Sequence, residues 1–221
     1  ALKVPAKEPE KPENWKTEVL SDSLNVTHNF WPVYEKPGTA PQILVTSYDG
    51  VHVVKSDGDK WATTKIGEGN QANPKGTRGA SEIKKSADKL GVVATIEPWH
   101  GNQVVVYTPP KEAGKLWNRH VVDEQFRWGH AVWFADLDGD GTDELVIGVR
   151  DDPNPKAGDK HTERRGVRVY KATDGKGEKW ERTIIEDGGV AVEDLTVADL
   201  DGDGKPDIIA VGRATGNARI Y

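Results

Sequence analysis

The stretch Trp180-Glu-Arg-Thr-Ile-Ile185 decides the fold, because the chain holds three more stretches of the same pattern. Each begins with tryptophan and then alternates polar and apolar residues: Trp15-Lys-Thr-Glu-Val-Leu20, Trp61-Ala-Thr-Thr-Lys-Ile66 and Trp117-Asn-Arg-His-Val-Val122. Such alternation is typical of strands with one buried face. Successive tryptophans lie roughly 45–65 residues apart, a spacing that indicates repeats of one small sheet.

Three more strand-like runs follow each tryptophan strand, and those of the last copy reach the end of the sequence. They are 27–34, 43–48 and 51–55 in the first copy, 80–86, 92–97 and 103–108 in the second, 130–135, 145–150 and 167–171 in the third, and 193–198, 208–213 and 218–221 in the fourth. Four strands per unit, joined by hairpins, are typical of a β-propeller blade.

The strand count predicts how the ring closes. The fourth copy has no tryptophan strand after it, whereas a spare one lies at 15–20. We therefore expect an all-β propeller of four antiparallel, four-stranded blades over residues 15–221, in which the N-terminal strand closes the last blade and hides its edge. The alternative is a segment of a larger, seven-bladed propeller, which the absence of methionine keeps open. Residues 1–14, rich in Pro, Lys and Glu, are predicted to be a disordered or extended linker.

Composition excludes several classes of function. The 221 residues carry a formal net charge of -6 and no basic cluster, so nothing favours a nucleic-acid partner. No run approaches the ~18 apolar residues of a membrane-spanning helix, so we expect no membrane span. The absence of cysteine excludes disulfides and thiol chemistry.

Two predicted hairpin loops carry the same acidic ladder. Alternating carboxylates in a tight loop converge on one point, and Ca²⁺ prefers such sets of hard oxygen ligands. We predict two Ca²⁺ sites, with side-chain ligands at the first, third, fifth and ninth positions and a backbone carbonyl at the seventh. The ligands are Asp136, Asp138, Asp140, Thr142 and Glu144 in one loop, and Asp199, Asp201, Asp203, Lys205 and Asp207 in the other. Mg²⁺ or Na⁺ could occupy the same loops, and a solvated acidic turn is the simplest alternative.

This ladder resembles the FG-GAP/VCBS repeat family, whose members are extracellular or periplasmic propellers that carry Ca²⁺. The resemblance implies that the ions brace hairpins and take no part in chemistry. The corresponding loops of the first two copies, 34–42 and 86–91, lack the ladder, so we predict no ion in them.

The opposite face of the propeller collects ionisable residues. Alignment of the copies gives one shared position, at the start of the innermost strand, to His28, Glu82, His130 and Glu193. In a closed ring these four converge at one mouth of the central channel. They could bind a transition metal, or they could serve as general base and acid. A water-filled channel with a polar mouth is the equally weighted alternative.

A second set of polar residues follows the next strand of each copy. The aligned strand ends are Tyr48, Glu97, Arg150 and Arg213, and the second copy adds Trp99, His100 and Asn102. Aromatic, imidazole and amide groups in one cluster suit the binding of a polar ring. The third copy inserts a long loop, 151–166, with His161, Arg164 and Arg165, which we interpret as a lid or binding segment.

Several phrases narrow the resemblance. These are His28-Asn-Phe30, Ile96-Glu-Pro-Trp-His-Gly-Asn102, Trp128-Gly-His-Ala131 and Gly216-Asn-Ala-Arg-Ile-Tyr221, and they resemble the propeller part of aldos-2-ulose dehydratase/isomerase-like proteins. Fungal enzymes of that family dehydrate keto-sugars by β-elimination, and their larger propeller is joined to cupin domains. The resemblance implies that His130 or His28 is the base and that His100, Glu193, Arg150 and Arg213 position the substrate.

We therefore expect a calcium-stabilised, extracytoplasmic (periplasmic or secreted) propeller that binds or acts on a carbohydrate at the face opposite the calcium loops. If it is an enzyme, it is a sugar lyase or dehydratase. Two alternatives stay open: a non-catalytic scaffold or adhesion propeller with a protein partner, and a fragment that needs missing blades or another subunit.

Overall fold

A computed structural model describes residues 1–58, 60–150, 161 and 163–221 of the chain. The described residues form β-strands and one short 3-10 helix, Pro12–Asn14. No helix within them is long and apolar enough to cross a membrane. The all-β prediction is thus confirmed.

Three sheets are four-stranded and antiparallel, with each strand hydrogen-bonded to the next in the chain. Sheet 1 consists of β3 (Phe30–Val33), β4 (Gln42–Ser47), β5 (Gly50–Asp57) and β6 (Lys60–Gly67). Sheet 2 consists of β7 (Ile83–Lys85), β8 (Val93–Glu97), β9 (Gln103–Thr108) and β10 (Asn118–Asp123). Sheet 3 consists of β11 (Gly129–Ala135), β12 (Glu144–Val149), β13 (Gly166–Ala172) and β14 (Trp180–Asp187).

Sheet 4 has three strands among the described residues: β15 (Val192–Ala198), β16 (Asp207–Gly212) and β17 (Asn217–Ile220). The strand predicted to complete it is elsewhere, because β2 (Lys16–Thr17) pairs with β1 (Leu2–Lys3). The prediction of a ring closed by the N-terminal strand is therefore wrong in this structure. The physical reason is local: the Glu18 carboxylate accepts the indole N–H of Trp61 (2.9 Å) and pairs with Lys3 (2.9 Å), which holds this segment beside sheet 1.

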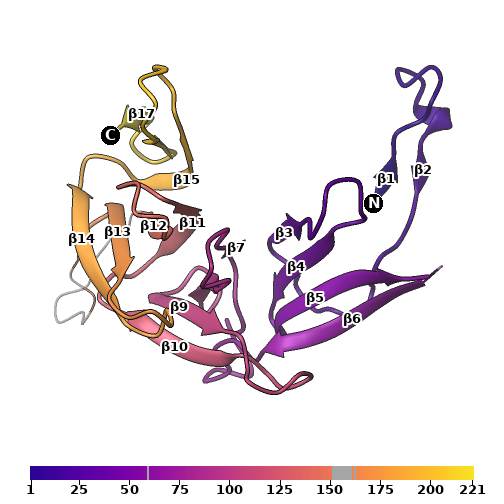
Figure 1. Ribbon diagram of the computed structural model, residues 1–221, viewed down its shortest axis with the longest axis horizontal. Helices are drawn as coiled ribbons and strands as arrows, with labels where there is room; N and C mark the ends of the chain where they lie inside the picture. Colours follow the sequence, from indigo (N-terminus) through magenta and orange to yellow (C-terminus); the bar gives the residue numbers. More distant parts are fainter. Residues whose placement is uncertain (59, 151–160, 162) are drawn as a thin grey trace.

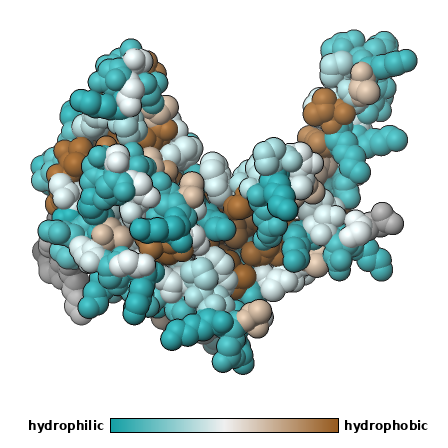
Figure 2. Space-filling model, viewed as in Figure 1, coloured by the Kyte–Doolittle hydropathy of each residue, from teal (hydrophilic) through white to brown (hydrophobic). Residues whose placement is uncertain are grey.

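The four sheets stand side by side along an open arc, with the N-terminus on one arm and the C-terminus on the other (Figure 1). The innermost strands β3, β7, β11 and β15 contact one another in sequence order and line the concave side. This radial arrangement of blade-like sheets confirms the propeller architecture. Figure 2 shows the hollow between the two arms, with apolar residues visible at its base.

Apolar side chains fill each space between neighbouring sheets. Leu44 and Tyr107 belong to the cluster between sheets 1 and 2, Ile96 and Ile147 to that between sheets 2 and 3, and Val146 to that between sheets 3 and 4. Polar links add to this packing at the second junction. Asp123 at the end of β10 accepts bonds from the Tyr170 hydroxyl (2.6 Å) and the guanidinium of Arg182 (3.0 Å), both from sheet 3.

The inner strand of sheet 2 is shorter than predicted, Ile83–Lys85 against 80–86. The ten-residue insertion before it explains the difference, because Asn70 and Gly79 bridge each other and the Ala80 N–H then donates to Ser47 O of sheet 1 (3.1 Å). Gly79 has a φ of +73°, and a Cβ there would lie 2.1 Å from Ser47 O. Only glycine fits this close approach.

Candidate functional site

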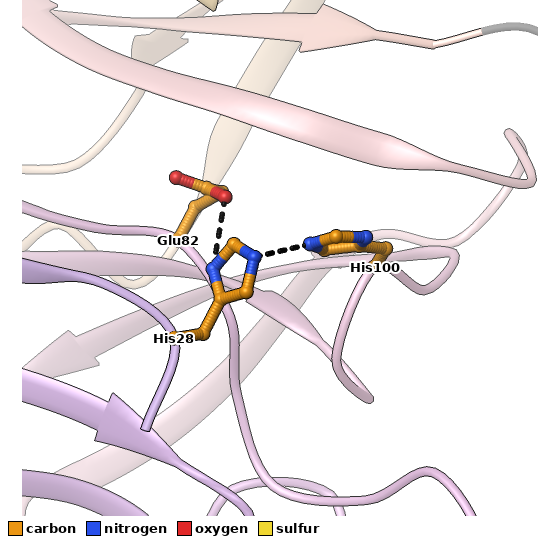
Figure 3. A group of neighbouring side chains, drawn as sticks. All are labelled: His28, Glu82 and His100. Carbon is orange, nitrogen blue, oxygen red and sulfur yellow. Dashed lines mark hydrogen bonds and ion pairs between the residues drawn. The ribbon is translucent and has the colours of Figure 1, made fainter. Parts of the chain in front are cut away.

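Three of the predicted residues meet at the concave end of the inner strands. His28, Glu82 and His100 each offer a ligand atom within 4.8 Å of the others. Glu82 Oε1 lies 3.3 Å from Nδ1 of His28, and Nε2 of His28 lies 2.6 Å from Nε2 of His100 (Figure 3). Asn29 anchors the other carboxylate oxygen of Glu82 at 2.5 Å. The structure therefore brings together His28 and Glu82, to which the alignment of the repeats gave one shared position.

His130 and Glu193 form the neighbouring half of the cluster. The His130 ring lies 4.5 Å from that of His100 and 6.4 Å from that of His28. Nδ1 of His130 is 2.6 Å from the backbone carbonyl of Glu193, and Nε2 is 3.9 Å from Oε1 of the same residue. Because a carbonyl only accepts, Nδ1 carries the proton in the neutral ring and Nε2 holds the free lone pair.

Two arginines neutralise Glu193. Arg150 lies 3.6 Å from one carboxylate oxygen and Arg213 lies 3.1 Å from the other. Both arginines were predicted from the strand ends, and the structure brings both to the cluster. Arg150 also stands over the Trp128 ring at 5.5 Å, so its guanidinium extends from Glu193 toward an aromatic wall.

Burial sets the charge of the cluster. Desolvation lowers the pKa of His28 and His130, and it lowers the pKa of His100 to about 3, with further lowering by the nearby His130. Burial also raises the pKa of Glu82 to about 7. Each buried group thus favours its neutral form, which is the expected effect of removing a charge from water. At neutral pH the imidazoles are unprotonated and can accept protons or bind a metal.

A pocket of about 430 Å³ opens beside the cluster. It is lined by two indoles, two imidazoles, two guanidinium groups and small polar groups. The lining residues are Thr77, Pro98, Trp99, His100, Gly101, Asn102, Arg127, Trp128, Arg150 and His161. Aromatic walls with a few polar groups are typical of small-molecule sites.

Aromatic contacts fix the position of Trp99 at the edge of this pocket. Its ring lies 4.7 Å from that of His28 and 4.8 Å from that of Tyr48, and Arg78 stands over the Tyr48 ring at 4.9 Å. Tyr48 therefore supports Trp99, which is the residue that faces the pocket. The prediction that both belong to one site is consistent with these contacts.

Glu97 was predicted to contact the substrate, but it does not line the pocket. Its side chain is fully buried, where it accepts bonds from the Tyr107 hydroxyl (2.6 Å) and the Arg119 guanidinium (2.7 and 2.9 Å). The alternation of β8 explains this, because Glu97 lies on the same face as Thr95, whose hydroxyl donates to it at 3.0 Å. Glu97 belongs to the packing between sheets.

The two acidic loops lie at the opposite ends of the strands and share one conformation. In the first, the Asp136 carboxylate accepts the N–H groups of Gly139 (2.8 Å) and Gly141 (2.9 Å). In the second, Asp199 accepts those of Gly202 (2.7 Å) and Gly204 (3.0 Å). The last acid of each ladder accepts the N–H of the leucine that follows the first acid, at 2.8 Å in both loops.

The donor sets of these loops fit a cation. Oε1 of Glu144 is buried and has no hydrogen-bond partner, although it lies among the carboxylates of Asp136 and Asp138. The ammonium of Lys171 partly neutralises the negative charge of these carboxylates. It contacts Asp138 and lies 2.8 Å from Asp140 and 3.7 Å from Glu144. Asp199, Asp201 and Asp203 form the corresponding group in the second loop.

Sequence reasoning missed Lys171, Asn29 and Trp128. Lys171 gave no signal, because its partners lie some thirty positions away in the chain. Trp128 could have been found, since it precedes Gly129-His130 much as Trp99 precedes His100. Of the predicted lid at 151–166, residues 151–160 and 162 lie outside the described part of the chain. His161 is described, and its Nδ1 lies 3.0 Å from the Glu124 carbonyl.

Comparisons with known proteins agree with this architecture. The family described as "Aldos-2-ulose dehydratase, beta-propeller domain" matches residues 2–112, and the FG-GAP-like repeat matches residues 157–210. A relative, "Aldos-2-ulose dehydratase" of Phanerodontia chrysosporium, is 30% identical over 160 residues. The match covers 65% of this chain but only 17% of the relative's length. Because the first match spans half of the 221 residues, the chain belongs to the family of aldos-2-ulose dehydratase β-propeller domains.

Proposed function

We propose that this propeller binds a keto-sugar in the pocket beside His100 and removes water from it by β-elimination. The observation that carries the proposal is the orientation of His130. Its Nδ1 accepts no substrate proton because it is bonded to the carbonyl of Glu193, so Nε2 is the free base of a ring that lies 4.5 Å from His100, which lines the pocket with Trp99 and Trp128. Fixing the tautomer through Nδ1 is the way that proteins prepare a histidine for proton transfer.

In this reaction Nε2 of His130 takes the proton from the carbon beside the sugar carbonyl. The C–H electron pair then forms the enolate, and its collapse expels the hydroxyl group from the next carbon. The imidazolium of His130 then returns its proton to the departing hydroxyl, which leaves as water. Arg150 stabilises the negative charge that builds on the carbonyl oxygen.

His28, Glu82 and His100 also fit a divalent transition metal. Nδ1 of His28 and Oε1 of Glu82 are buried and lack a hydrogen-bond partner, which is the expected state of atoms that a cation would satisfy. Two histidines and one carboxylate are a common donor set for such ions. When bound, the metal would polarise the sugar carbonyl and so acidify the proton that His130 removes.

The direct test is turnover of keto-sugars by the wild-type chain. β-Elimination next to a carbonyl yields a conjugated enone, so we expect a new ultraviolet absorbance and a product lighter than the substrate by one water. Metal analysis of the same sample should find a bound transition metal, and the His28→Ala variant should contain less of it per chain. The proposal would be contradicted if metal-loaded protein failed both to bind and to turn over every keto-sugar tested.

The acidic loops support a second part of the proposal, two Ca²⁺ ions that brace the hairpins of sheets 3 and 4. Calcium sites of extracellular modules have dissociation constants of about 10⁻⁴–10⁻³ M, and such calcium concentrations occur outside the cytoplasm. We therefore assign the domain to the periplasm or the exterior of the cell.

Calcium should raise thermal stability. An ion present at about 100 times its Kd stabilises the fold by about 2.7 kcal/mol per site, roughly 5–11 °C for a chain of this size. Scanning calorimetry with calcium and with chelator measures the shift. We expect Asp199→Asn to lose the part of the calcium-dependent shift that the second loop contributes. Asp22 lies outside both loops, so Asp22→Asn should keep the full shift. A melting temperature that is the same with calcium and with chelator would refute the two sites.

A further inference from the structure

The side chains that line the pocket beside His100 are rich in hydrogen-bond donors. Arg127 and Arg150 can only donate, and so can the indole N–H groups of Trp99 and Trp128. None of the residues that line this pocket in the described part of the chain is an aspartate or a glutamate. A ligand that satisfies such a lining must supply acceptors, and the oxygens of carboxylates and phosphates make the strongest bonds of this kind.

Two acceptors of the lining are already bonded within the chain. The carbonyl of Gly101 accepts the N–H of Gly129 at 2.9 Å, and the carbonyl of Trp128 accepts the N–H of Arg150 at 2.8 Å. A neutral sugar presents many hydroxyl protons, each of which needs an acceptor when it is buried. This lining therefore suits a neutral sugar less well than a sugar that carries an anionic group.

The fold holds both arginines at the pocket. Arg127 follows Phe126, whose side chain is fully buried between sheets 2 and 3, and the backbone of Arg150 is bonded to Trp128. The Arg150 guanidinium also lies 3.6 Å from Glu193. A guanidinium has five N–H donors in a planar fork, so an arginine that has a partner in the protein still offers donors to a second anion.

We propose that the sugar bound in this pocket is acidic: it carries a carboxylate or a phosphate group, which Arg127 holds through charge-assisted hydrogen bonds. This inference rests on the proposed function in taking the pocket as the sugar site. Arg150 is then left to contact the oxygen of the reacting carbonyl, while Trp99 and Trp128 pack against the sugar ring. Arg127 selects the substrate and takes no part in the proton transfer.

Binding to the wild-type chain is the first test, and it requires no variant. D-glucuronate and D-glucose 6-phosphate differ from D-glucose only at the sixth carbon, so isothermal titration of the three isolates the effect of the anion. We expect at least one acid to bind about 10–100-fold more tightly than D-glucose, and the tighter of the two tells a carboxylate site from a phosphate site. Equal affinities for the three sugars, or no detectable binding of either acid, overturn the proposal.

Replacement of Arg127 is the second test. Arg127→Gln should weaken the binding of the preferred acid about 10–100-fold and leave that of D-glucose unchanged. Arg127→Lys keeps the charge but loses the planar fork, so it should recover part of the affinity. Arg219→Gln is the matched control: Arg219 pairs with Glu186 at 2.6 Å and does not line the pocket, so its removal should not alter binding. Unchanged binding of the acid by a folded Arg127→Gln variant would assign the anion to another residue and overturn the proposal.

The outcome is separate from that of the proposed reaction. If no keto-sugar is turned over, the affinities for acidic and neutral sugars still decide whether the pocket selects an anion. If neutral keto-sugars are turned over as efficiently as acidic ones, the reaction stands and the inference about Arg127 fails. In an active chain, Arg127→Gln should raise KM for an acidic keto-sugar and leave kcat nearly unchanged, because the arginine binds a group that does not react.

Discussion

Replacing His130 by alanine should reduce keto-sugar turnover by about 10²–10⁴-fold, the usual contribution of a general base. The reason is geometric. Nε2 of His130 is the free lone pair of the cluster, since Nδ1 lies 2.6 Å from the Glu193 carbonyl. Alanine removes the base but leaves Trp99, Trp128 and Arg150 to bind the sugar. We therefore expect the loss in kcat, with a small change in KM.

The matched control is His120→Ala. His120 lies on the outer strand β10, where its Nε2 is 3.1 Å from the Thr108 hydroxyl, so this variant loses one imidazole away from the pocket. Its turnover should equal that of the wild type. Steady-state kinetics of both variants decide the matter: equal kcat in His130→Ala and wild type would exclude His130 from the reaction.

Replacing Arg119 by leucine should lower the free energy of unfolding by about 3–5 kcal/mol near neutral pH. Arg119 is the only cation that contacts the buried Glu97 carboxylate within the described residues, through bonds of 2.7 and 2.9 Å. Leucine keeps much of the packing volume but leaves a buried carboxylate without its cationic partner. Urea unfolding measures the loss.

The loss should depend on pH with a definite sign. Burial raises the pKa of Glu97 even in the wild type, where Arg119 opposes the shift. Without Arg119 the pKa rises further. A carboxyl group whose pKa is raised by folding favours the folded state below its ordinary pKa and loses that contribution as the pH rises through the folded value. The stability deficit of Arg119→Leu is thus largest at neutral pH and shrinks on acidification.

Two comparisons test this explanation. Arg213→Leu also removes an arginine from a glutamate, but Arg213 is 72% exposed, so its loss should cost at most about 1 kcal/mol. Adding Glu97→Gln to Arg119→Leu removes the titrating group, and the pH dependence of the deficit should then disappear. A deficit in Arg119→Leu that is constant with pH would show that lost packing, and not the isolated charge, is its cause.

The sequence predicted the repeat and much of the cluster because both follow from spacing. The tryptophan phrases alternate with the period of a strand, and equal intervals after Trp117 and Trp180 bring His130 and Glu193 to equivalent strand starts. Their contact follows once the sheets stand side by side. The same reasoning places His28 beside Glu82, which lie 3.3 Å apart.

Other features depend on geometry that spacing does not encode. Glu97 was assigned to the pocket because it ends a strand, but the face of a terminal residue depends on where the pleat stops. Lys171 on β13 contacts an acidic loop between β11 and β12, so no short sequence motif contains both and predicts their contact. The closed four-bladed ring failed because a strand count does not show which partner a strand takes, and β2 pairs with β1 instead of with sheet 4.

The Asp123 carboxylate has a consequence for how the domain unfolds. It belongs to sheet 2, yet two of its donors, Tyr170 and Arg182, belong to sheet 3. If sheet 3 melted alone, sheet 2 would lose these two bonds and expose the apolar face that packs against sheet 3. Peeling one blade from the arc therefore penalises the blade left behind, and sheets 2 and 3 should lose structure in a single cooperative transition, unlike the stepwise melting of solenoid repeats.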